Sequence, residues 1–207
     1  MSAIYENIAL AAHKAKKNIA EQVFAEELAL IENEALKVAV TRYLNEAAPS
    51  YFWTAPSSSS GKHHSRFDAG EGGLVRHTKM TIAVCMELLR LSGMEQVVQG
   101  EAIAALLIHD SVKNGMNGAH YRADHPRLAA ERWHTFVDKE FGPEVTYLRP
   151  VFYYALWHSG QWSGPSIRDN FERPQDLLAG IKVVHLSDYI ASRNFFNKAV
   201  DFANEFI

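Results

Sequence analysis

The sequence has few of the features that mark secreted, membrane or nucleic-acid-wrapping proteins. A single cysteine, Cys85, is present among 207 residues, so no intramolecular disulfide can form, and a reducing compartment is favoured. No run approaches the ~20 apolar residues that a membrane span needs. A net charge of -3 argues against salt-driven wrapping of DNA or RNA, although it leaves room for a small basic pocket that takes one phosphate group.

The amino-terminal residues do not have the pattern of a signal peptide. Glu6, His13 and Lys14 interrupt the apolar segment that such a peptide requires. We therefore expect a cytoplasmic protein with no membrane partner. Its apolar content of 47% and charged content of 22% are ordinary for a globular protein, and 207 residues fit one domain with a substantial core.

Helical spacing of apolar residues runs through most of the chain, and no segment shows the sustained alternation of a strand. We therefore predict an all-α fold, with a single domain over 1–207. Its predicted parts are amino-terminal helices over 1–47, an irregular loop over 48–73 and a helical core over 74–207. Breaks in the first part are expected near Asn18 and Asn33. The predicted helices of the core cover 74–91, 96–108, 125–140, 144–158, 174–192 and 194–206.

The loop 48–73 contains Pro49, Pro56, a run of four serines and four glycines. A stretch of this length without secondary structure is typical of a functional loop or of disorder. The aromatic run Tyr51-Phe52-Trp53 near its start predicts that this end is anchored. His63 and His64 are candidates to cover a substrate site, and a plain polar loop is the alternative.

Ten histidines are the one unusual feature of the composition. His109-Asp110 directly follows the apolar segment 102–108, where a charged carboxylate is costly unless it is paired or binds a metal. Neutral imidazole beside carboxylate is a common ligand set for transition metals. His77 and Asp188 belong to two further helices with apolar faces, and converging helices of a bundle are a usual scaffold for metal clusters.

Two more histidines lie at predicted helix ends between these positions. His125 opens a helix just before Pro126, and His158 closes the helix before Ser159. Each has a simpler interpretation, His125 as a residue near a helix N-terminus and His158 as a C-terminal cap. The remaining histidines of interest are expected to be core or capping residues: His13, His120, His134 and His185.

In order along the chain, His77, His109-Asp110 and Asp188 resemble the defining pattern of the HD superfamily of metal-dependent phosphohydrolases. The intervening His125 and His158 resemble the histidines of its two-metal branch. The segment Gly72-Gly73-Leu74-Val75-Arg76-His77-Thr78 is similar to a stretch of HD-type 3′–5′ exoribonucleases. The Gly-Tyr-Pro signature of cyclic-dinucleotide phosphodiesterases is missing, and no OB domain precedes the matched region.

The resemblance implies an HD-domain helical bundle with one or two divalent metal ions (Mn, Fe, Co, Ni, Zn or Mg). In this hypothesis His77, His109, Asp110 and Asp188 hold one metal, and Asp110 bridges to a second metal held by His125 and His158. A water molecule activated by the metals would then attack the phosphate ester.

Cationic side chains near these ligands are candidates to stabilise phosphate charge. Lys113, three residues after Asp110, would offset charge that develops on the phosphoryl group, and a solvated lysine is the alternative. Arg76, Lys79 and Arg122 are candidates to bind further phosphates.

The expected function is hydrolysis of a nucleotide phosphate ester or phosphodiester, with a nucleotide or short oligonucleotide as substrate. The alternatives are a catalytically weak nucleotide-binding regulatory module, a 3′–5′ exonuclease on short single-stranded nucleic acid, and a purely structural helical partner protein. Trp157 and Trp162 flank His158, where they either stack on a base or pack in the core. The sequence leaves open whether the chain forms a homo-oligomer.

Overall fold

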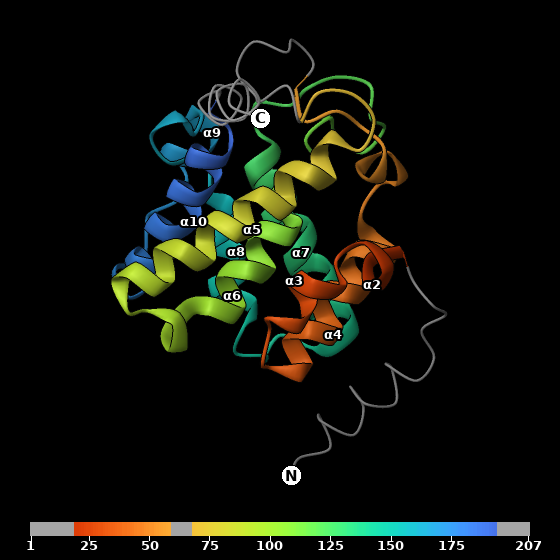
Figure 1. Cartoon of the computed structure of the whole chain (residues 1–207). Helices are drawn as coiled ribbons and strands as arrows, with labels where there is room; N and C mark the ends of the chain where they lie inside the picture. Colours follow the sequence, from red (N-terminus) through yellow and green to blue (C-terminus); the bar gives the residue numbers. More distant parts are fainter. Residues whose placement is uncertain (1–18, 59–67, 194–207) are drawn as a thin grey trace, which may run out of the picture.

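The computed structural model describes residues 19–58 and 68–193, and over these residues it contains helices and no strands. The predicted all-α fold is therefore confirmed. Helices α5, α6, α7, α8 and α10 make up most of the bundle, and Figure 1 shows α5 lying across it, with α6 and α10 against it. Their bounds are α5 Gly73–Ser92, α6 Glu95–Ile108, α7 His125–Phe141, α8 Leu148–Leu156 and α10 Leu178–Ala191.

Helix α6 occupies the centre because its second half presents no polar side chain. Every residue from Ala102 to Ile108 has zero solvent exposure. The helix packs against α5, α8, α10 and α4 (Glu34–Arg42), so its apolar surface is covered on all sides. A helix that is apolar all round is stable only in such surroundings. Among the described residues, no helix combines the length and apolarity that crossing a membrane would need.

The amino-terminal helices are shorter than predicted. They are α2 Ile19–Val23, α3 Ala25–Ala29 and α4, followed by a π-helical turn over Tyr43–Ala47. Asn33 ends the gap before α4 as its N-cap, since the side-chain oxygen accepts a hydrogen bond from the Leu36 N–H at 3.1 Å. The predicted break near Asn33 is thus confirmed. The one predicted near Asn18 lies outside the described residues.

The start of the irregular stretch is anchored, as its aromatic run predicted. A 3-10 turn over Ser50–Trp53 places Phe52 in the core with zero exposure. The Tyr51 hydroxyl donates to the Gly115 carbonyl at 2.7 Å and accepts from the Asn114 N–H at 3.0 Å. This end of the stretch therefore holds the turn that follows α6. His63 and His64 lie outside the described residues.

Later in the chain, the helices deviate from prediction mainly at their ends. The segment predicted at 144–158 is helical only over Leu148–Leu156, and a 3-10 turn over Gln175–Leu177 precedes α10. Two short elements were not predicted, a 3-10 turn over Gly160–Trp162 (η4) and α9 over Pro165–Arg168. Pro165 opens α9, because its fixed φ suits the first position of a helix. The predicted helix 194–206 lies outside the described residues.

The close approach of α10 to α8 depends on a glycine. A Cβ at Gly180 would lie 2.1 Å from Cζ of Tyr154, whose ring is 3% exposed and so has little room to move. Gly100, inside α6, differs: a Cβ there would meet Leu36 at an ordinary 3.6 Å.

We expect alanine substitutions at the two helical glycines to change the free energy of unfolding in opposite directions. Gly180→Ala should lower the free energy of unfolding by ~1–3 kcal/mol, because the methyl group overpacks a buried contact. Gly100→Ala, the matched control, should raise it by about 0.5–1 kcal/mol, because alanine suits a helix interior better than glycine. Urea denaturation followed by circular dichroism measures both. A stabilised Gly180→Ala variant would contradict the packing described here.

Candidate metal centre

The six predicted ligands come together, although they are up to 111 positions apart in the chain. All but Asp188 are at most 5% exposed, and the Asp188 side chain is 21% exposed. They come from five places: His77 from α5, His109 and Asp110 from the turn after α6, His125 from the first position of α7, His158 from just after α8, and Asp188 from α10.

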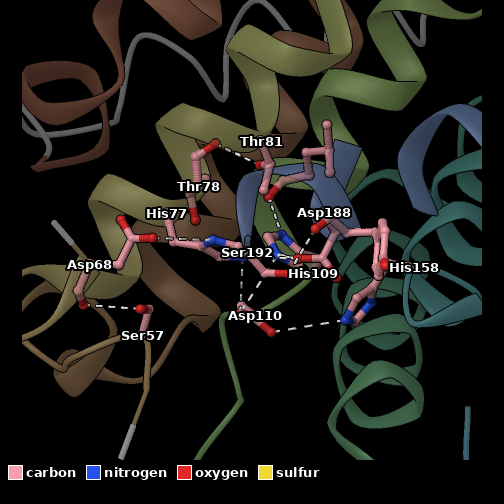
Figure 2. Close-up of polar contacts among 12 residues, drawn as sticks. Ser57, Asp68, His77, Thr78, Thr81, His109, Asp110, His158, Asp188 and Ser192 are labelled. Carbon is pink, nitrogen blue, oxygen red and sulfur yellow. Dashed lines mark hydrogen bonds and ion pairs between the residues drawn. The ribbon is translucent and has the colours of Figure 1, made fainter. Parts of the chain in front are cut away.

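One group that could hold a metal ion consists of His77, His109 and Asp188. Asp188 Oδ1 lies 2.9 Å from His77 Nε2 and 3.7 Å from His109 Nε2. Asp110 Oδ2 lies 3.8 Å and 3.6 Å from the same two nitrogens. In Figure 2, the side chains of His77, His109, Asp110 and Asp188 converge on one region. Two imidazoles and two carboxylates thus face one another.

A second group consists of Asp110, His125 and His158. Asp110 Oδ1 lies 3.0 Å from His125 Nε2 and 3.9 Å from His158 Nε2, and the two nitrogens are 3.2 Å apart. The two oxygens of Asp110 therefore face different groups. This is the arrangement expected of a carboxylate shared between two ions.

The backbone sets which nitrogen of three histidines faces the centre. In His109, His125 and His158, Nδ1 contacts the carbonyl oxygen of the residue three positions earlier, at 2.6, 2.7 and 2.7 Å. A carbonyl oxygen only accepts, so each Nδ1 donates its proton and each neutral ring keeps a lone pair on Nε2. Burial lowers the pKa of His109, and it lowers the pKa of His158 to about 3. Both rings are therefore neutral near pH 7, as metal ligands must be.

These inward lone pairs fit a bound cation. Among residues 19–58 and 68–193, the buried Nε2 of His109 has no hydrogen-bond partner. Leaving such a buried atom unpaired costs ~1–3 kcal/mol of folding stability. The Nε2 atoms of His125 and His158, 3.2 Å apart, both carry lone pairs in these tautomers. Two nitrogens each ~2.1 Å from one tetrahedral ion would be about 3.4 Å apart. The donor set and its spacing thus suit a divalent transition metal.

A lysine balances the most buried charge of the centre. Lys113 Nζ donates to Asp110 Oδ2 at 2.6 Å. Burial opposes ionisation of Asp110, but the neighbouring groups, Lys113 foremost, together hold the pKa of this carboxyl well below its usual range. For Asp188 burial acts in the same way, and the hydrogen bond with His77 keeps its pKa low. Both carboxylates are therefore ionised near neutral pH.

The centre forms one wall of an open cavity of about 440 Å³. Asp110, Lys113, His125, His158 and Asp188 line that wall. Aromatic and hydroxyl side chains make up most of the rest: Ser57, Ser58, Tyr121, Ser159, Trp162, His185, Tyr189, Ser192 and Arg193. A ligand could therefore reach the centre without any change of fold.

Helix α10 supplies four cavity residues that share one face. His185, Asp188, Tyr189 and Ser192 have the spacing i, i+3, i+4 and i+7, which aligns side chains on a helix. This spacing around Asp188 was a usable signal in the sequence. His185, expected to be a core or capping residue, instead lines the cavity, and its Nδ1 donates to the His158 carbonyl at 2.8 Å.

Arg76, Lys79 and Arg122 are not among the residues that line this cavity. Their side chains make other polar contacts: Arg76 with the carbonyls of Ala69 and Glu71, Lys79 with the carboxylate of Glu27, and Arg122 with Asp124. Their phosphate-binding role stays a prediction, and these contacts favour structural roles instead.

Asp68, which carried no signal in the sequence, lies behind His77. It is 2% exposed, and its Oδ2 is 4.0 Å from His77 Nδ1, on the opposite side of the ring from Asp188 (Figure 2). The Asp68 backbone passes so close to α5 that a Cβ on Gly73 would lie 2.0 Å from its carbonyl oxygen. If a metal took the place of the contact between His77 Nε2 and Asp188, the charge of Asp68 would favour the tautomer with the proton on Nδ1 and a bare Nε2 toward the metal.

Comparisons of the chain with known protein families, with curated proteins and with solved structures give no match. The interpretation of the centre therefore depends on its own residues and geometry.

We expect Mn²⁺ or Zn²⁺ to raise the midpoint of thermal unfolding, because an ion that binds only the folded chain at 100 times its Kd adds about 2.7 kcal/mol of stability. Asp110→Asn should abolish most of this rise, since Asp110 faces both groups. Asp169→Asn, at an exposed position after α9, is the control and should keep it. Elemental analysis gives the number of ions per chain. An undiminished rise in Asp110→Asn would contradict the assigned ligands.

Asp68→Ala should weaken metal binding by ~10–100-fold, the usual effect of removing the partner of a metal-bound histidine. Glu71→Ala changes an exposed carboxylate three residues away and should leave the affinity unchanged. Titration with a competing chelator measures both, with circular dichroism as the check on folding. Equal affinities in the two variants would show that Asp68 does not orient His77.

Proposed function

We propose that this protein is a metal-dependent phosphohydrolase of the HD type, which cleaves a phosphate ester or phosphodiester of a nucleotide or short oligonucleotide. The observation that carries this proposal is Asp110, whose two oxygens face two separate ligand groups at the wall of an open cavity. The order of the ligands along the chain, which resembles the HD pattern, supports the same class of reaction.

A divalent metal ion in such a site would lower the pKa of a water molecule and draw negative charge from the phosphoryl oxygens. The chain provides what that chemistry requires. Its histidines His109, His125 and His158 turn lone pairs inward, and the carboxylates of Asp110 and Asp188 are ionised. Burial of the ligands keeps competing water away from all but the cavity side.

Lys113 is the cation best placed to meet a substrate phosphate. It is 9% exposed and lines the cavity, where its ammonium group contacts Asp110 Oδ2 at 2.6 Å. Charge that develops on a phosphoryl group beside it would be stabilised in surroundings that contain little water. The hydroxyl of Ser159 also lines the cavity and offers a hydrogen bond to a phosphate or sugar oxygen. The hydroxyls of Ser57 and Ser192 line it too, but they donate to the backbone carbonyls of Asp68 and Tyr189.

The test is phosphate or nucleotide release, measured with Mn²⁺, Co²⁺, Ni²⁺, Mg²⁺ or Zn²⁺. The substrates are a panel of nucleoside monophosphates, a short single-stranded oligonucleotide and bis(4-nitrophenyl) phosphate. We expect turnover that depends on the metal and is lost in Asp110→Asn. Metal-loaded protein that binds nucleotides and consumes none would overturn the hydrolase and indicate a regulatory module.

Lys113→Met should lower kcat by ~10²–10³-fold, because an electrostatic contact to the transition state is lost. The metal content should not change, since Lys113 is not among the ligands. Lys182→Met, at an exposed position of α10, is the control and should match the unaltered protein. Loss of metal from Lys113→Met would show that the lysine serves to hold Asp110 rather than to act on the substrate.

A further inference from the structure

Trp162 is a large apolar side chain that stays exposed inside the cavity. Its indole is 56% exposed, although it lines the same cavity as the metal centre. The ring is nonetheless held in place, because it stacks on Tyr189 with the ring centroids 4.9 Å apart and the planes 11° from parallel. An ordered aromatic surface left open to solvent is typical of a binding site.

Neighbouring side chains support this stack. The Arg193 guanidinium lies over the Tyr189 ring, 4.1 Å from its centroid, and its Nε donates to the Tyr189 carbonyl at 3.3 Å. The ring of His185 lies 5.6 Å from that of Trp162. The Tyr189 ring is therefore covered by Trp162 and Arg193, whereas the indole keeps surface for a ligand.

The stack is also tied to the metal centre through the backbone. Tyr189 directly follows Asp188 on α10, and Trp162 ends η4, the turn that begins two residues after His158. The start of this turn is tightly packed against α10, because a Cβ on Gly160 would lie 2.4 Å from the ring of His185. The distance from the ligands to the stack is thus set by the fold and not by loose loops.

We propose that Trp162, stacked on Tyr189, forms an aromatic platform whose open indole surface receives the planar ring of the substrate, while its phosphate faces Lys113 and Asp110. This inference rests on the proposed function and adds the part of the substrate that is recognised. A cavity of about 440 Å³ lies within the usual size range for small-molecule sites. Stacking contacts the face of a ring and not its edges, so the platform accepts different nucleobases.

The platform is tested first by kinetics on two esters that differ only in the ring, adenosine 5′-monophosphate and ribose 5-phosphate, each with Mn²⁺. Trp162→Ala should lower kcat/KM for the nucleotide by ~10-fold and leave the value for ribose 5-phosphate unchanged. Trp162→Phe, which keeps a ring, should recover most of the loss. Leu186→Ala, an exposed position of α10 that does not line the cavity, is the control.

A second readout needs no turnover. Binding of adenosine 5′-monophosphate to metal-free protein, measured by calorimetry, should weaken by a similar factor in Trp162→Ala. If no ester is cleaved but this binding still depends on Trp162, the proposed hydrolase fails and the platform stands.

Other outcomes overturn the platform itself. An equal loss for both esters, or none for the nucleotide, would show that Trp162 does not contact the ring. Phenyl phosphate serves as a third ester, because a planar ring can also belong to an aryl group. If it is a better substrate than the nucleotide, and equally dependent on Trp162, then the platform receives aryl groups and not nucleobases.

Discussion

Asp110 carries a negative charge just after a helix whose second half is apolar on every side, and the surrounding structure compensates for it. An isolated buried carboxylate would be far too costly to retain. Here the Lys113 ammonium contacts one oxygen at 2.6 Å. The other oxygen lies 3.0 Å from His125 Nε2, whose lone pair also faces the centre, so a cation bound between the two would complete the compensation. The turn after α6 and the first position of α7 thus meet around one charge.

The same helix ends orient the histidines. His109 and His158 follow the ends of α6 and α8, and each ring donates Nδ1–H to a carbonyl oxygen in the last turn of its helix. His125 makes the same contact before α7. A hydrogen bond to the backbone therefore also turns a lone pair of each ring toward the centre. The orientation that the backbone favours is the one that a metal would require.

Helix α10 joins the core to the cavity. One face, including Ile181 and Val184, packs inside the bundle, and the adjoining face turns Asp188 and Tyr189 toward the cavity. The spacing between a metal ligand and an aromatic ring is therefore set by helical geometry. A substrate with a phosphate at one end and a planar ring at the other matches this division of the cavity.

The sequence by itself determined the all-α class, the central helix 96–108 and the set of six candidate metal ligands. These depend on apolar periodicity and on the ligand chemistry of histidine and aspartate, which belong to the residues themselves. Only the tertiary structure placed Asp68 behind His77 and brought His185 and Trp162 to the cavity. It also decided that Lys79 pairs with Glu27, outside the cavity. These positions depend on which distant segments of the chain pack together. The local sequence around a lone polar or aromatic residue does not identify the side chain that it will contact.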